Sequence, residues 1–306
     1  MGLRRWRTVL FVPGDRPDRV DKAGRSGADA VAIDLEDAVA GEAKDRARAA
    51  TVEHLRTKRS VPTMVRINAR DSGELERDVE QLAPVWANVD AVILPEASGA
   101  SDVKYLDELL QRTLGPGGPA MIPIVETAVG VFEARATAAA SPRVNTLLFG
   151  PADLTAELGI APSADGHELA FARAQVVLAA AAAHLAGPID GPHLVLADDQ
   201  GLTRSTRSAR ELGFAGKAVI HPEQITIVNA GFGPTSADLT WAEQVLAAVA
   251  ADGAGALRLA DGTFIDEAIV RRARKIIAEH QGHHGGSTSS DHTRRCSTGA
   301  VGKGET

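Results

Sequence analysis

The feature that most constrains the fold of this chain is a repeated order of short apolar run, loop and helical segment. The runs are mostly continuous rather than alternating in polarity, which is typical of parallel strands covered on both faces. Segments between them, such as Asp45–Arg56, Gly73–Val85 and Glu168–Leu185, carry helical spacing. The eight runs, of which the seventh is the weakest, are Thr8–Val12, Ala30–Leu35, Thr63–Ile67, Asp90–Leu94, Ala120–Val125, Thr146–Phe149, Gly187–Asp190 and Lys217–Ile220. They predict an α/β fold, a (β/α)8 TIM barrel rather than an open sheet.

The chain beyond the eighth run has a different organisation. Leu239–Ala251 and Asp266–His280 are expected to form helices, with a loop or short hairpin between them over Gly253–Thr263. Asp266 is placed to cap the second helix. The remaining sequence is rich in Gly, Ser and Thr and has little to bury. We therefore expect a catalytic barrel over residues 1–235, a helical extension over residues 236–281 and a disordered tail over residues 282–306.

Composition narrows the classes of protein to which the chain can belong. A formal net charge of -7 argues against nonspecific nucleic-acid binding driven by bulk charge. The chain has one cysteine, Cys296, so no internal disulfide is available and a cytoplasmic location is expected. The apolar run Thr8–Pro13 is too short for a signal peptide or a membrane span. We expect neither a nucleic-acid partner nor a membrane.

Polar residues and glycines follow almost every run, and in a (β/α)8 barrel the active site lies at those strand ends. One such residue alone is more often part of a solvated loop or a helix cap, but a complete ring of them indicates a site. We expect Pro13 and Gly14, and Gly150 and Pro151, to contact the substrate. The ring consists of Pro13, Gly14, Asp15, Arg16, Asp34, Glu36, Asp37, Arg66, Asn68, Pro95, Glu96, Glu126, Thr127, Gly150, Asp153, Asp190, Gly191, His221, Pro222 and Gln224.

Glu126 and Asp153 are the pair that we predict to hold a metal ion. They follow consecutive strands, so barrel closure makes them neighbours. Two facing carboxylates repel each other, and without a cation one of them takes up a proton. Mg²⁺ resolves this conflict because it binds one or two protein carboxylates and completes its octahedron with water and substrate oxygens. Asp153 is also expected to lie against the substrate.

Arg66 suits an anionic substrate, because its fork can grip a carboxylate and its charge can stabilise an oxyanion. The same residue is compatible with a salt bridge to the acidic residues after the second run, and the two roles do not conflict. Glu36 and Asp37 are expected to orient Arg66 and to accept hydrogen bonds from metal-bound water. We interpret His221, which precedes a proline, as structural. Lys217 begins the eighth run, at the wrong end of the barrel for a Schiff base.

Six motifs together resemble the citrate lyase β-subunit-like branch of the HpcH/HpaI aldolase/citrate lyase superfamily. Each lies at an expected strand end, and in order they cover nearly all of the chain except the tail. The motifs are LFVPGDRPDRVDKA (Leu10–Ala23), GADAVAIDLEDAV (Gly27–Val39), MVRIN (Met64–Asn68), PIVET (Pro123–Thr127), LLFGPADL (Leu147–Leu154) and GFAGKAVIHPEQI (Gly213–Ile225).

The resemblance implies an oxo-acid-lyase, a metal-dependent barrel that works as a homotrimer or hexamer. Such an enzyme cleaves or forms the bond between a 2-oxo acid and the enolate of a CoA or acyl-carrier thioester. Malyl-CoA, β-methylmalyl-CoA, citramalyl-CoA and citryl thioesters are substrates of relatives. The family's metal ligands fall on Glu126 and Asp153, its arginine on Arg66 and its acidic pair on Glu36 and Asp37. Its C-terminal lid, which supplies an aspartate to a neighbouring subunit, falls on Asp261–Ala273 with Asp266 as that aspartate.

Three alternatives stay open at the level of sequence. The same site could serve a thioester hydrolase in which Asp266 activates water, or a non-catalytic subunit that only binds an acyl thioester. It could also serve a metal-dependent aldolase on free hydroxy acids. Relatives often have lysine where Glu96 follows Leu94 and Pro95 here. This reversal of charge near the mouth of the site favours the third alternative a little.

Overall fold

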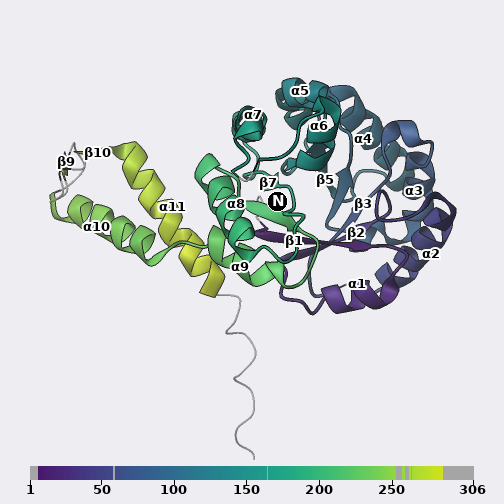
Figure 1. The fold of residues 1–306 in the computed structure, drawn as a ribbon, viewed down its shortest axis with the longest axis horizontal. Coiled ribbons are helices and arrows are strands. Elements are labelled where there is room, and N and C mark those ends of the chain that lie inside the picture. The colour runs from purple at the N-terminus through teal and green to yellow at the C-terminus, as the bar shows by residue number, and fades with distance from the viewer. Residues whose placement is uncertain are drawn as a thin grey trace, which may run out of the picture. The chain divides into compact units, whose positions relative to one another are not determined.

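The computed structural model describes residues 6–57, 59–163, 165–252, 257–258, 262 and 264–284. Its main feature is a closed barrel of parallel strands in sequential order, β1 to β8, surrounded by helices (Figure 1). The predicted (β/α)8 barrel is therefore confirmed, and every strand overlaps its expected run. The strands are β1 Thr8–Pro13, β2 Ala30–Asp34, β3 Thr63–Arg66, β4 Ala91–Leu94, β5 Ala120–Val125, β6 Leu148–Phe149, β7 Ile189–Asp190 and β8 Gly216–Val219.

Helices connect the strands and cover the outside of the barrel. The expected helix over Gly73–Val85 is wrong in one respect: it is divided into α3 and the 3-10 helix η3, because Pro84 has no N–H with which to continue an α-helix. The α-helices of this part are α1 Pro17–Ala23, α2 Lys44–Leu55, α3 Leu75–Gln81, α4 Ala100–Leu114, α5 Ala128–Ala138, α6 Pro151–Leu158, α7 Ala170–Ala182, α8 Asp199–Leu212 and α9 Gln224–Phe232. The 3-10 helices are η1 Gly41–Ala43, η2 Arg70–Ser72, η3 Ala83–Asn88 and η4 His167–Leu169.

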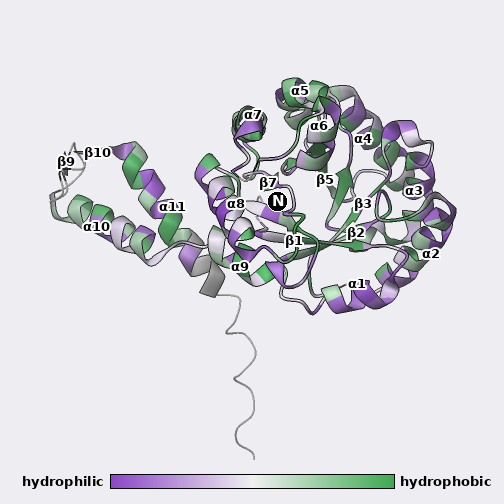
Figure 2. Ribbon diagram, in the orientation of Figure 1, coloured by the Kyte–Doolittle hydropathy of each residue, from purple (hydrophilic) through white to green (hydrophobic). Residues whose placement is uncertain are grey.

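The strands are apolar on both faces because each face meets a different core. In β1, Val9 packs with the residues that fill the barrel interior, and Phe11 lies against the same cluster. The alternate residues Leu10 and Val12 belong to the layer between the barrel and the helices. Figure 2 shows the result as apolar strands inside helices whose outer faces are largely hydrophilic. This two-sided burial explains why the runs do not alternate in polarity.

A buried charged cluster lies in the helix-facing layer beside β7 and β8. Asp190 Oδ2 lies 2.5 Å from Lys217 Nζ and 2.9 Å from Arg173 Nη2 of α7. Lys217 lies on the same face of β8 as Val219, which belongs to the helix-facing core. Lys217 is therefore not placed to form a Schiff base with a substrate. Its side chain faces the helices outside the barrel, and the residue lies early in its strand. Asp190, which we placed in the site ring, belongs to this cluster instead.

The contacts within the chain divide it into two compact units, residues 1–232 and 233–306. In the second unit, α10 (Ser236–Asp252) and α11 (Glu267–His284) pack together around Val245 and Ile265. The short strands β9 (Leu257–Arg258) and β10 (Phe264–Ile265) form the hairpin that joins them. Helix α11 includes residues 282–284 of the expected tail, and the rest of that tail lies outside the described residues. Among the described helices, none has the length and apolarity that a bilayer crossing needs.

The Asp190 cluster generates a prediction about stability. Asp190→Ala leaves Arg173 and Lys217 buried without their carboxylate, and should lower the free energy of unfolding by roughly 3–5 kcal/mol in urea denaturation. The matched control Glu211→Ala removes an exposed carboxylate of α8 and should change it by less than about 0.5 kcal/mol. Equal effects of the two substitutions would show that the buried cluster contributes nothing specific.

Candidate active site

Arg66, the last residue of β3, organises the carboxylates at the C-terminal end of the barrel. Its Nε donates to Asp34 Oδ1 at 2.7 Å and its Nη2 donates to Asp34 Oδ2 at 2.5 Å, a two-pronged pair. Its Nη1 lies 2.6 Å from Glu36 Oε2 and 3.4 Å from Asp37 Oδ2. The guanidinium also lies over the ring of Phe11, 5.5 Å from its centroid. The predicted salt bridge of Arg66 to the acidic residues after β2 is therefore confirmed.

Asp34, buried at the end of β2, anchors both the arginine and the loop that follows. Besides the pair with Arg66, Asp34 Oδ1 accepts a hydrogen bond from Glu36 N at 2.9 Å, and Oδ2 accepts one from Ala38 N. Lys44 Nζ donates to the carbonyl oxygens of Leu35 and Glu36, at 2.7 and 2.8 Å. These bonds hold the Glu36 backbone between β2 and α2, so the position of its carboxylate does not depend on Arg66 alone.

Glu126 directly follows β5 and is buried. Its Oε1 accepts a hydrogen bond from the backbone N–H of Glu96 at 2.6 Å, which fixes one oxygen and leaves the other for a ligand. Glu96 adopts a left-handed φ of 50°, uncommon for a residue other than glycine, at this point of contact. A Cβ on Gly150 would lie 2.5 Å from both Cβ and Oε2 of Glu126, so glycine is required there by close approach.

Asp153 lies in the first turn of α6, and its carboxylate adjoins that of Glu126. Burial raises the pKa of Glu126, the backbone N–H of Glu96 opposes the shift, and the neighbouring Asp153 carboxylate adds to it. Asp153 is itself exposed to solvent. The structure thus brings together the two residues predicted as metal ligands, one buried and one facing the solvent.

Glu36 is a second acid whose protonation the site controls. Burial raises the pKa of Glu36 to about 8; the Arg66 charge opposes this shift, while the charges of Asp37 and Glu126 add to it. Burial also opposes the charge of Arg66, but Asp34 and Glu36 outweigh that effect and raise its pKa. Glu36 Oε2 has no aligned hydrogen bond despite its closeness to Arg66, so a lone pair of this buried oxygen is free for another donor.

The glycine loops of the predicted substrate contacts lie tightly against this acidic centre. Gly14 N donates to Asp34 O at 2.8 Å, and a Cβ on Gly14 would lie 2.8 Å from Leu35 Cδ2. Pro13 pairs with Asp34 in the register of β1 and β2. Gly150 and Pro151 begin α6, next to Glu126. Four of the predicted contact residues therefore border the carboxylates.

Three further predicted residues are described by their own contacts. Asp37 is largely exposed and touches only the edge of the Arg66 guanidinium. His221 is half-exposed and lies 3.4 Å from Glu223. Asp266 caps α11, accepting a hydrogen bond from Ile269 N at 2.9 Å, which confirms its predicted capping role. Asp266 belongs to the second unit, and its predicted catalytic role stays a prediction.

Two residues of the site were missed at the level of sequence. Phe11 is a β1 residue whose apolar character gave no signal of its contact with Arg66. Lys44 could have been found from its position. A lysine at the first position of a helix interacts unfavourably with the helix dipole, so another interaction is expected to hold it there. Asp34 was predicted as a member of the strand-end ring and as a salt-bridge partner of Arg66, and the structure shows that it also binds the backbone of the loop after β2.

The donor set fits a hard divalent cation. Glu126 and Asp153 offer carboxylate oxygens, and the pKa of Glu126 is raised by burial and, to a smaller extent, by the adjoining Asp153 carboxylate. Another group with metal-ligand character, Asp165, His167 and Glu168, lies in the exposed segment after α6. Its members already bond one another and Ser163, and exposed acidic groups of this kind are common without an ion.

Comparisons with known proteins agree with this geometry. Residues 7–222 match the HpcH/HpaI aldolase/citrate lyase family. Citrate lyase subunit beta from Leuconostoc mesenteroides subsp. cremoris is 34% identical, over 91% of this chain and 94% of that protein. L-malyl-CoA/beta-methylmalyl-CoA lyase from Rhodobacter capsulatus is 32% identical, over 89% of this chain and 94% of that protein. The crystal structure of CitE from Mycobacterium tuberculosis with magnesium, acetoacetate and coenzyme A superposes with a TM-score of 0.78. It is 34% identical, over 90% of this chain and 98% of that one.

The raised pKa values predict how the metal-free protein responds to pH. Glu36 has a pKa of about 8 in the folded chain, whereas its ordinary value is 4.5. Between these two pH values the folded state therefore binds more protons than the unfolded state. Glu126 shifts in the same direction. Their contribution to stability is therefore present at low pH and is lost as the pH rises through about 8. We expect the metal-free melting temperature to fall over this window, and to fall less steeply in Glu126→Gln.

Two controls make this pH test specific. Glu53→Gln, which changes an exposed carboxylate of α2, should leave the slope of the wild type unchanged. Adding Mg²⁺ near pH 8 should raise the melting temperature of the wild type more than that of Glu126→Gln, because a ligand that binds only the folded state stabilises it. Identical slopes and identical metal responses in all three proteins would contradict the assignment of the site.

Proposed function

The chain belongs to the HpcH/HpaI aldolase/citrate lyase family, and from that membership and the acidic centre we propose that it is a magnesium-dependent carbon–carbon lyase. Its substrate is a 3-hydroxyacyl thioester of the malyl-CoA, citramalyl-CoA or citryl-CoA type, which it cleaves to a 2-oxo acid and an acyl thioester, or forms from them. The observation that carries the proposal is the adjoining pair of carboxylates, Glu126 and Asp153, which follow the neighbouring strands β5 and β6. Arg66 lies at the same end of the barrel.

Glu126 and Asp153 are the residues that would hold the ion. Magnesium bound there would supply a Lewis acid for the carboxylate and adjacent oxygen of the 2-oxo acid. The hydrogen bond from the Glu96 N–H holds the Glu126 carboxylate in the orientation in which it would meet the ion. Asp153, being exposed, faces the side from which substrate arrives.

Arg66 is proposed to stabilise the substrate oxygen that becomes an alkoxide. In cleavage, a base removes the proton of the substrate hydroxyl, and the oxygen forms a carbonyl as the carbon–carbon bond breaks. The electrons of that bond pass to the thioester, which leaves as an enolate and takes a proton at carbon. Asp34 and Glu36 hold the Arg66 fork in position, and the Glu36 and Asp37 carboxylates are proposed to accept hydrogen bonds from metal-bound water. No lysine Schiff base is needed.

The proton donor to the enolate is proposed to be Asp266 from a neighbouring subunit. The resemblance of Asp261–Ala273 to a family lid supports this role, and with it an assembly as a homotrimer or hexamer. The same resemblance supports Pro13, Gly14, Gly150 and Pro151 as substrate contacts. The single cysteine supports a cytoplasmic location, because a reducing compartment leaves such a chain free of disulfides.

The first test is a panel of malyl-CoA, citramalyl-CoA and citryl-CoA, assayed with and without Mg²⁺. We expect release of a 2-oxo acid that requires the metal and that falls at least about a hundredfold in Asp153→Asn, which keeps the size of the side chain but removes its charge. Glu53→Gln should retain the wild-type rate. Thioester hydrolysis without release of a 2-oxo acid would move the assignment to a hydrolase. Tight thioester binding without turnover would move it to a binding subunit, and indifference of the rate to CoA would indicate an aldolase on free hydroxy acids.

A second test separates the two roles of Asp266. Asparagine is as good an N-cap as aspartate, so Asp266→Asn should leave the melting temperature nearly unchanged. Because the amide cannot donate the proton as a carboxylic acid does, kcat should fall by about a hundredfold or more. Asp266→Ala should lose both the cap, about 1 kcal/mol, and the activity. If Asp266→Asn keeps full activity, Asp266 is a helix cap and no more.

A further inference from the structure

A cavity of about 160 Å³ lies at the opposite end of the barrel from the carboxylates. It is bordered by the C-terminal ends of α1 and α2 and by the starts of β2 and β3, at Val31 and Thr63. The volume is several times the roughly 30 Å³ that one water occupies in the liquid, so a polyatomic ion fits. Nothing in the proposed lyase mechanism uses this end of the barrel.

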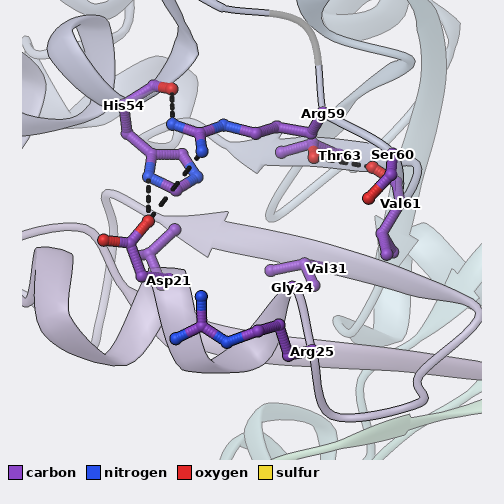
Figure 3. A pocket seen from close by; sticks show the side chains of 10 residues that line it. Asp21, Gly24, Arg25, Val31, His54, Arg59, Ser60, Val61 and Thr63 are labelled. Atoms are coloured by element: carbon purple, nitrogen blue, oxygen red, sulfur yellow. Dashed lines mark hydrogen bonds and ion pairs between the residues drawn. The ribbon is translucent and has the colours of Figure 1, made fainter.

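The charged groups around the cavity are two arginines and one aspartate, because burial and the Arg59 charge lower the pKa of His54. Arg59 and His54 reach over it from one side and Arg25 lies on the other, with Asp21 at its edge (Figure 3). Asp21 Oδ1 already serves two of these groups, lying 3.2 Å from His54 Nδ1 and 3.9 Å from Arg59 Nη1. Within the part of the chain that the structure describes, Arg25 forms no ion pair. The cavity therefore has more positive charge than its carboxylate can balance.

The wall of the cavity makes that charge effective. Val20, Val31 and Val61 form an apolar lining, which lowers the local dielectric and strengthens any ion pair made there. Arg59 Nε is buried and has no hydrogen-bond partner among the described residues, a costly state for a charged donor. Arg59 Nη2 donates to His54 O, so the spare Nε N–H of Arg59 and the Arg25 guanidinium across the cavity are the donors that a tetrahedral oxyanion would meet.

We propose that this cavity is a binding site for a free tetrahedral oxyanion of the size of inorganic phosphate, held between Arg25 and Arg59. The hydroxyl of Ser60, which also borders the cavity, can serve as a further donor, whereas that of Thr63 already donates to Val61 O. Because residues at this end of a (β/α)8 barrel govern stability rather than chemistry, the bound anion stabilises the barrel without entering the reaction.

A competing explanation assigns the same arginines to helix ends. α1 and α2 end here, and cations near a helix C-terminus interact favourably with its dipole without any ligand. The two explanations differ in one measurable respect. Compensation of the dipole stabilises the protein equally with and without phosphate, whereas a binding site gives a stabilisation that rises with the logarithm of the phosphate concentration once this exceeds the dissociation constant.

The experiment is thermal unfolding of the full magnesium-loaded chain in increasing inorganic phosphate, against chloride at matched ionic strength. We expect a rise in melting temperature that follows the logarithm of the phosphate concentration and reaches about 2–4 °C at a concentration twentyfold above the dissociation constant. Arg59→Gln and Arg25→Gln should each weaken the apparent affinity by about tenfold or more, the effect of losing one charge-assisted hydrogen bond. The matched control Arg207→Gln, an exposed arginine of α8, should retain the full rise.

The outcomes decide the proposal in either direction. A rise that is lost in both cavity variants and kept in the control, with kcat/KM unchanged in the absence of phosphate, supports the site. No rise in the wild type overturns it. An equal rise in every variant also overturns it, because the phosphate would then bind at the catalytic end. A constant loss of stability in Arg25→Gln and Arg59→Gln at every phosphate concentration overturns it as well, because the arginines would then act on the helix dipoles. Apart from the kcat/KM comparison, none of these outcomes depends on whether the lyase assignment is correct.

Discussion

The catalytic end of the barrel concentrates more negative charge than Arg66 can neutralise. The guanidinium pairs with Asp34 and Glu36 and reaches Asp37, while Glu126 and Asp153 adjoin each other nearby. Burial raises the pKa values of Glu36 and Glu126, and the neighbouring carboxylates add to both shifts. The repulsion between these acids is relieved if some of them hold protons or if a cation joins them. A divalent ion therefore suits the charge balance of the site as well as its chemistry.

The backbone around this centre is shaped to hold the acids in place. Glu96 adopts its left-handed conformation where its N–H meets Glu126, which is the kind of local strain that functional sites retain. Gly150 and Gly14 let neighbouring segments approach without a clashing Cβ. The side chain of Glu96 takes no part in the bond to Glu126. Its departure from the lysine common in relatives therefore leaves the geometry of the metal ligands unaffected and acts only at the exposed mouth of the site.

Charge is used differently at three places in the molecule. At the catalytic end it is unbalanced and negative, which suits a cation and an anionic substrate bound through it. Beside β7 and β8 it is buried and internally paired, which stabilises the contact of the helices with the barrel. At the opposite end of the barrel, around Arg25 and Arg59, it is unbalanced and positive. The same strand-and-helix framework thus supports sites of opposite polarity because the two ends of the barrel lie apart.

The sequence by itself determined the barrel, because parallel strands that are buried on both faces appear in the sequence as continuous apolar runs. It also determined Glu126 and Asp153 as a pair, since consecutive strands of a closed barrel are neighbours whatever the loops do. The motif resemblance pointed to the family in the same way, through local order along the chain. The cap at Asp266 followed too, because capping depends on residues three positions apart.

Only the tertiary structure decided what depends on side chains meeting from distant segments. It made Asp34 the anchor of Arg66, brought Phe11 and Lys44 to the same end of the barrel, and placed Asp190 with Lys217 outside it. Along the chain, Asp34 and Asp190 look alike, since each is an aspartate that ends a strand. Strand pleat directs one into the catalytic end and the other toward the helices, and that direction is set by register within the closed barrel, which no local pattern contains.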